Sequence, residues 1–135
     1  MNSASRFPSF WIALGGALGA LCRYGVECGA DRLLHSGAGF PWATFGVNLA
    51  GAFLLGWILS RAATGGSGGE WLRLFAGIGF CGAFTTFSSV NLEMVELADS
   101  GSLALAAVYF VSSFVCGIAM AWIGAGFGLK PRKVC

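Results

Sequence analysis

Four long apolar stretches, separated by short polar segments, constrain this chain more than any other feature of its sequence. They cover residues 7–22, 42–60, 74–92 and 100–129, and none of them contains a charged residue. A helix needs about 20 residues, at about 1.5 Å each, to cross a hydrocarbon core roughly 30 Å thick. We therefore predict an all-α membrane protein. Its single domain spans residues 1–135, with four transmembrane helices at about 7–26, 42–61, 71–96 and 101–129.

The composition excludes an ordinary soluble domain. Hydrophobic residues make up 56% of the chain and charged residues 10%, whereas soluble domains carry about 25% charged residues. The net charge of +2 is small and the basic residues are scattered, so we expect no nucleic-acid partner. Glycines four residues apart predict close helix packing in lipid. These pairs are Gly15/Gly19 and Gly124/Gly128.

Positive charges favour one end of the predicted bundle. The basic residues on the side of the N-terminus are Arg6, Arg61, Arg73, Lys130, Arg132 and Lys133. Two basic residues lie on the opposite side, with most of the acidic ones: Arg23, Arg32, Glu27, Asp31, Glu93, Glu96 and Asp99. Because Lys and Arg are enriched in cytoplasmic loops, this bias predicts that both termini are cytoplasmic.

Groups that could support catalysis are scarce at membrane depth. The apolar stretches contain no His and no Lys, and His35 lies in a predicted loop. Glu93 and Glu96 share a helical face, but they lie near the end of the third predicted helix, which is typical of helix-end carboxylates. An enzyme would need a convergent set of titratable or metal-binding groups. We therefore expect that the chain is not an enzyme.

Neutral hydrogen-bonding groups occupy the apolar stretches instead. Asn48 lies in the second stretch, four hydroxyl residues lie at 85–89, and Tyr109 and Ser113 lie one turn apart in the fourth. Polar groups in lipid are costly unless they pair or line a wet path. Two interpretations stay open: the hydroxyls bond their own helix backbones, or they form a polar path.

The sequence Gly-Phe-Cys-Gly-Ala-Phe-Thr-Thr at 79–86 predicts a break in the third helix. Two glycines and two β-branched threonines lower helix propensity there. Broken helices at membrane depth expose carbonyl oxygens and often bind ions. Backbone and hydroxyl oxygens suit a hard cation.

Three blocks of sequence resemble the CrcB/Fluc family of fluoride channels. They are residues 79–89 followed by Glu93, residues 15–20 leading to Arg23 and Tyr24, and residues 44–53. The resemblance implies a fluoride-selective ion channel in the cell inner membrane. Such a channel lets F⁻ leave the cytoplasm passively and lowers fluoride toxicity.

The resemblance also implies an assembly and a set of site residues. The assembly is an antiparallel, dual-topology dimer in membrane lipid, with one structural sodium ion (Na⁺) at the dimer centre, held by main-chain oxygens of Gly82 and Thr85. The implied fluoride-pore residues are Asn48, Phe87, Ser88, Tyr109 and Ser113. The implied structural or orienting residues are Arg23, Thr86 and Glu93.

Departures from the family pattern leave alternatives open. Val90 stands where the family usually has a second pore phenylalanine, and Gly117 stands where some members carry a hydroxyl. Val90 and the charge bias together allow a second hypothesis, in which the chain is one subunit of an obligate heterodimeric fluoride channel. A small multidrug-type, proton-coupled transporter would need an acidic residue in the first helix, and residues 10–22 contain none. The remaining class is a membrane subunit that transports nothing.

Overall fold

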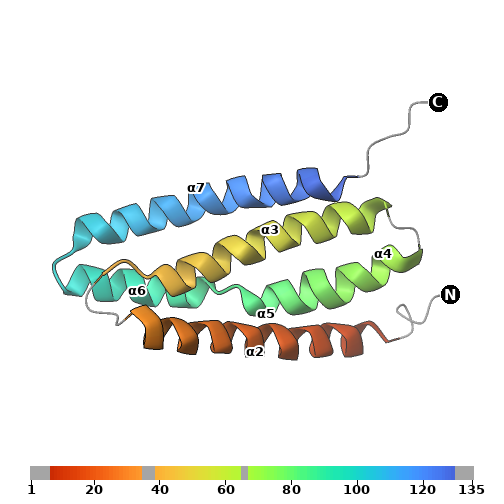
Figure 1. Cartoon of the computed structure of the whole chain (residues 1–135), viewed down its shortest axis with the longest axis horizontal. Helices are drawn as coiled ribbons and strands as arrows, with labels where there is room; N and C mark the ends of the chain where they lie inside the picture. The colour runs from red at the N-terminus through yellow and green to blue at the C-terminus, as the bar shows by residue number, and fades with distance from the viewer. Residues whose placement is uncertain (1–6, 35–38, 65–66, 130–135) are drawn as a thin grey trace.

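The structure is a computed structural model that describes residues 7–34, 39–64 and 67–129. Helices make up nearly all of these residues (Figure 1). They are α2 (Pro8–Leu34), α3 (Trp42–Thr64), α4 (Ser67–Leu72), the π-helix η1 (Arg73–Cys81), α5 (Gly82–Phe84), α6 (Phe87–Asp99) and α7 (Leu103–Gly128). His35 lies outside the described residues.

Four helical segments are long and apolar enough to cross a membrane: Pro8–Ala30, Trp42–Thr64, Gly68–Asp99 and Leu103–Gly128. The third consists of α4, η1, α5 and α6 placed end to end, with an interruption after α5 (Figure 1). These findings confirm the predicted all-α membrane fold and the break in the third helix.

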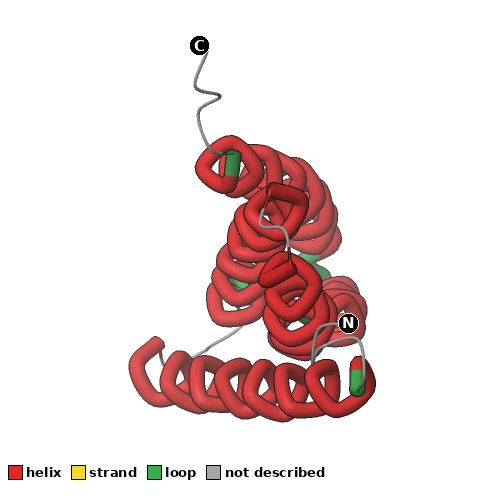
Figure 2. Tube along the Cα trace, turned by 90° about the vertical axis from the view of Figure 1, so that its right-hand side faces the viewer, coloured by secondary structure: helices red, strands yellow, loops and turns green. Residues whose placement is uncertain are grey.

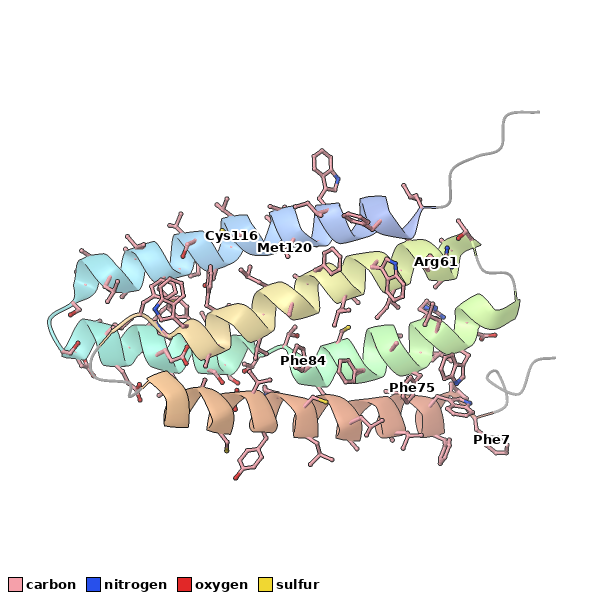
Figure 3. The ribbon with its side chains drawn as sticks, viewed as in Figure 1. Phe7, Arg61, Phe75, Phe84, Cys116 and Met120 are labelled. Carbon is pink, nitrogen blue, oxygen red and sulfur yellow. The ribbon has the colours of Figure 1, made fainter. Side chains whose placement is uncertain are left out.

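The helices form two closely packed pairs. Contacts are most extensive between α3 and α7 and between α2 and η1. Figure 2, a view along the long axis, shows α7, α3 and the broken third span stacked on one another, with α2 lying across the base of the stack. The start of α2 and the end of α7 lie at one end of the molecule, where Arg61 also lies (Figure 3).

Glycines allow this close approach. A Cβ atom at Gly15 or Gly19 of α2 would overlap a backbone carbonyl oxygen of η1. A Cβ atom at Gly124 or Gly128 of α7 would likewise collide with α3. The packing predicted from both glycine pairs is thus confirmed: each permits backbone-to-backbone contact that a methyl group would prevent.

Three local features differ from expectation. The first helix continues to Leu34 instead of ending near residue 26, and the third span covers more residues than the expected 71–96. The charged residues after residue 22 end the hydrophobic span, but they do not end the helix. Arg23 and Glu27 are one turn apart within α2, and they pair at an Nε–Oε1 distance of 3.9 Å. The nine-residue π-helix η1 was also unexpected; such segments are rare and usually only one turn long.

Candidate functional site

The third span opens at two threonines. Thr85 has φ −78° and ψ 155°, and Thr86 has φ −144° and ψ 123°, so both are extended while the residues on either side are helical. Gly82 keeps helical angles, with φ −62° and ψ −31°. The β-branched pair therefore marks the break itself, in keeping with the lower helix propensity and higher strand propensity of threonine.

Thr86 also begins the helix that follows the break. Its Oγ1 accepts a hydrogen bond from the Ser89 N–H at 3.2 Å, as expected of an N-cap threonine. The same oxygen lies 3.2 Å from Ser88 Oγ and 3.0 Å from Ser89 Oγ. This hydroxyl cluster marks the start of α6, where Thr86 is the N-cap residue.

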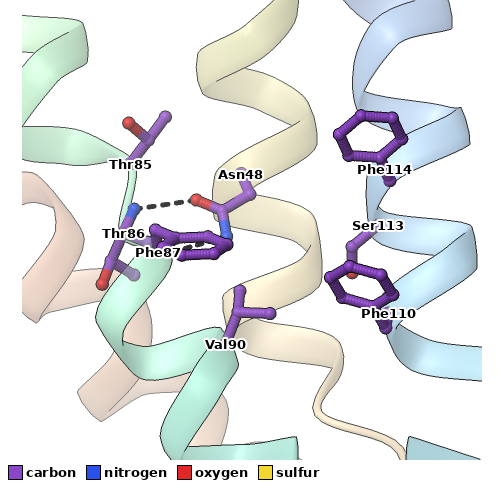
Figure 4. A pocket seen from close by; sticks show the side chains of 8 residues that line it. All are labelled: Asn48, Thr85, Thr86, Phe87, Val90, Phe110, Ser113 and Phe114. Carbon is purple, nitrogen blue, oxygen red and sulfur yellow. Dashed lines mark hydrogen bonds between the residues drawn. The ribbon is translucent and has the colours of Figure 1, made fainter. Parts of the chain in front are cut away.

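Asn48 of α3 forms hydrogen bonds with the extended backbone at the break. Its Nδ2 donates to the Thr86 carbonyl oxygen at 2.9 Å, and its Oδ1 accepts from the Thr86 N–H at 2.8 Å (Figure 4). Unpaired backbone groups at membrane depth cost several kcal/mol each. The Asn48 amide therefore supplies both of the hydrogen bonds that the extended backbone at Thr86 would otherwise lack.

The break also removes the helical donors of the Gly82 and Thr85 carbonyl oxygens. In an unbroken helix the Gly82 and Thr85 carbonyls would accept from the N–H groups four residues later. The Thr86 N–H donates to Asn48 instead, and the Ser89 N–H donates to Thr86 Oγ1. The main-chain oxygens of Gly82 and Thr85 thus lose their helical donors, which is compatible with the predicted sodium site; that site stays a prediction. Among the described residues, no group of three or more His, Cys, Asp or Glu could hold a metal.

A cavity of about 270 Å³ lies beside the break, between α3, α6 and α7 (Figure 4). Its lining is aromatic and aliphatic apart from an amide and three hydroxyl residues. Within the described structure, Ser113 Oγ is buried and has no hydrogen-bond partner. The lining residues are Asn48, Thr85, Thr86, Phe87, Val90, Phe110, Ser113 and Phe114.

Tyr109 lies in a different setting from Ser113, although the two are one turn apart on α7. The Tyr109 side chain is 0% exposed, and its hydroxyl donates to Glu93 Oε2 at 2.6 Å. Thr44 Oγ1 donates to the other oxygen of the same carboxyl group. Glu93 therefore connects α6 to both α3 and α7, and it does so outside the lining of the cavity.

The predicted site residues separate into three groups. Five predicted site residues line the cavity: Asn48, Thr85, Thr86, Phe87 and Ser113. Ser88 and Tyr109 are not among its lining residues, and Ser88 is exposed. Arg23 pairs with Glu27 on α2 and is absent from the cavity lining. The functional roles of all the predicted site residues, those in the cavity lining included, stay predictions.

Sequence reasoning missed three residues of this region. Thr44 carried a usable signal, because it lies one helical turn before Asn48 on α3. Phe110 and Phe114 flank Ser113 in sequence, but rings on an apolar helix face lipid as readily as a cavity. Which side they face depends on the packing of α7.

The sequence is similar to known proteins over most of its length. Residues 10–125 match the family model described as CrcB-like protein, Camphor Resistance (CrcB). The chain belongs to the CrcB-like family. Three relatives were compared across nearly their whole length. The chain is 43% identical over 117 residues to a fluoride-specific ion channel FluC of Thermus thermophilus, covering 87% of this chain and 90% of the relative.

The other two relatives carry similar names. Identity is 40% over 114 residues to the fluoride-specific ion channel FluC of Novosphingobium aromaticivorans, covering 84% of this chain and 90% of the relative. The chain is 37% identical over 122 residues to the fluoride-specific ion channel FluC 1 of Geobacillus kaustophilus, and the match covers 90% of this chain and 98% of the relative. The CrcB-like match includes α3, the break and most of α7, and therefore the whole cavity.

Proposed function

We propose that this chain is a subunit of a fluoride-selective ion channel that lets F⁻ leave the cytoplasm passively and so lowers fluoride toxicity. The names of its CrcB-like relatives support the proposal. The observation that carries it is the Ser113 hydroxyl, which is buried, has no partner among the described residues, and lines a cavity with Asn48 and Phe87.

The chemistry of the cavity suits a small anion. F⁻ is strongly hydrated, so a pathway must replace its water with hydrogen-bond donors. Asn48 has two amide hydrogens, of which one donates to Thr86, and Ser113 has one hydroxyl hydrogen. The edges of aromatic rings carry positive partial charge, so the Phe87 ring can also face an anion. Carboxylates are absent from the lining of this cavity.

Passive exit is sufficient for protection. Hydrogen fluoride is a neutral weak acid that crosses membranes and ionises in the cytoplasm, where the anion is trapped. A channel then needs only to return F⁻ down its electrochemical gradient. We place the chain as a multi-pass protein in the cell inner membrane, and we assign it transport and no enzymatic reaction.

Growth of a bacterial host that lacks its own fluoride exporter tests this function. The parent should restore growth in fluoride, and Asn48→Ala or Phe87→Ile should reduce it, because each removes a group that faces the anion. Immunoblots of isolated membranes control for the amount of each variant. Equal rescue by all three proteins would refute the assignment of the pore.

Sodium and a second subunit complete the proposal. Na⁺ would be held by the main-chain oxygens of Gly82 and Thr85, where it would offset negative charge and join two broken helices in an antiparallel dimer. Its support is the loss of helical donors at both carbonyls. Exchange of Na⁺ for N-methylglucamine should lower the thermal stability of the purified protein, because an ion bound to the native state stabilises it by mass action.

The partner is either a second copy or a sister subunit. Val90 and the uneven distribution of Lys and Arg favour the second case, whereas a self-paired, dual-topology dimer needs a balanced charge distribution. Expression of this chain alone, followed by reconstitution into fluoride-loaded liposomes, separates the two. Fluoride efflux without a sister subunit would rule out an obligate heterodimer.

A further inference from the structure

One turn of α7 supplies three of the residues that line the cavity: Phe110, Ser113 and Phe114. Residues three and four apart share a helical face, so these side chains project to the same side (Figure 4). An anion that accepts the free hydroxyl hydrogen of Ser113 therefore lies within the reach of both rings. The exposed fractions of Phe110 and Phe114 are 44% and 65%, so the rings are not enclosed by the rest of the chain.

The opposite wall of the cavity offers fewer rings. Phe87 begins α6, and one turn later the lining residue is Val90, which is 5% exposed and packs beside Tyr109. A valine presents only aliphatic hydrogens, which carry little charge. Two of the three aromatic rings in this lining thus come from α7.

We propose that Phe110 and Phe114 contact the anion and contribute to fluoride selectivity, with their ring edges solvating F⁻ that is hydrogen-bonded to Ser113. This inference rests on the proposed channel function. Ring edges attract anions electrostatically, and phenylalanine has only two side-chain torsions to hold in place. F⁻ attracts such edges more strongly than a larger halide, because its charge is concentrated in a smaller radius.

Methionine and tyrosine substitutions separate the ring edge from simple packing. Methionine fills a similar volume without a ring, whereas tyrosine keeps the ring. Each protein is reconstituted into fluoride-loaded liposomes, alone or with the sister subunit that it needs, and initial efflux is measured. Phe110→Met and Phe114→Met should each lower efflux about tenfold, a barrier increase of about 1.4 kcal/mol. Phe110→Tyr and Phe114→Tyr should retain most of it.

Phe127→Met is the matched control, since Phe127 lies on the same helix, is 72% exposed and is absent from the cavity lining. Its efflux should equal that of the parent. Gel filtration and thermal unfolding verify each fold, and a leucine substitution at the same position replaces any methionine variant that fails to fold. If folded methionine variants showed the efflux of the parent, this inference would be overturned and the proposed channel function would stand. The same holds if the tyrosine variants lost as much efflux as the methionine variants. A parent that passes no fluoride would overturn the proposed function as well.

Discussion

At the scale of single residues, Asn48 has two roles: it stabilises the break in the third span, and it lines the cavity. Its amide bonds both backbone groups of Thr86, and it lines the cavity with Ser113. The sequence suggested a polar role for Asn48 because an amide at membrane depth needs a partner. The partner itself could not be predicted, since it lies 38 residues away and depends on how α3 packs against the third span.

Asn48→Ala should therefore lower stability as well as transport. The substitution leaves the Thr86 N–H and carbonyl without partners, and an unsatisfied buried group costs about 1–3 kcal/mol. We expect a loss of about 2 kcal/mol or more, measured by thermal unfolding in detergent. Ser112→Ala is the control, because the one partner of the Ser112 hydroxyl among residues 7–34, 39–64 and 67–129 is the carbonyl of Tyr109 on its own helix. Equal melting of the two variants would contradict this role of Asn48.

Glu93 offers a second test at this scale. It accepts hydrogen bonds from Thr44 and Tyr109, on two different helices. Thr44→Val and Tyr109→Phe should each cost about 1–2 kcal/mol of unfolding free energy. Because both donors share one carboxyl group, the double variant should deviate from the sum of the single variants by about 0.5 kcal/mol or more. Strict additivity in thermal or denaturant unfolding would indicate that the two bonds are independent.

At the scale of elements, the sequence predicted the four spans and the break, but not the detailed course of the third span. Low helix propensity near residues 79–86 located the weak point. The break falls at Thr85 and Thr86 because Asn48 stabilises an extended backbone there, while Gly82 stays helical. The π-helix η1 has no comparable signal in the sequence; it packs closely against α2.

The packing of α3 against α7 predicts opposite behaviour for two glycines on one helix. A Cβ atom at Gly124 would overlap the Phe53 carbonyl, whereas one at Gly126 meets no described residue within 4 Å. Gly124→Ala should lower stability by about 2 kcal/mol or more through overpacking. Gly126→Ala should be neutral or slightly stabilising, because alanine favours helix by about 1 kcal/mol. Thermal unfolding of both variants checks this, and a stable Gly124→Ala protein would mean that the two helices are not in such close contact.

At the scale of the whole molecule, charge distribution bears on how the chain enters the membrane. Arg61 lies at the end of the bundle that holds the start of α2 and the end of α7 (Figure 3). Arg73 opens η1, whose start lies at the same end. Large apolar side chains remain exposed on the outside of the bundle, among them Trp122 of α7 at 83%. Sequence alone predicted the span count, but which outer face meets lipid and which meets a partner depends on the assembly.

Removing both arginines should change the orientation of the chain. Arg61→Gln combined with Arg73→Gln should increase the fraction of molecules whose N-terminus is outside the cytoplasm, since Lys and Arg retain loops on the cytoplasmic side. Accessibility of an N-terminal tag in intact cells measures that fraction. Glu70→Gln is the control, because acidic residues contribute little to orientation. An unchanged fraction in the double variant would show that these two arginines do not set topology.

The pairing of Asn48 with Thr86 has a consequence for biosynthesis. Chains are made from the N-terminus, so α3 leaves the ribosome before the threonine pair does. When the interrupted span arrives in the bilayer, the amide that saturates it is already present on an earlier helix. The open segment can therefore pair with Asn48 as soon as it enters the bilayer, and its peptide groups need not stay unpaired in lipid.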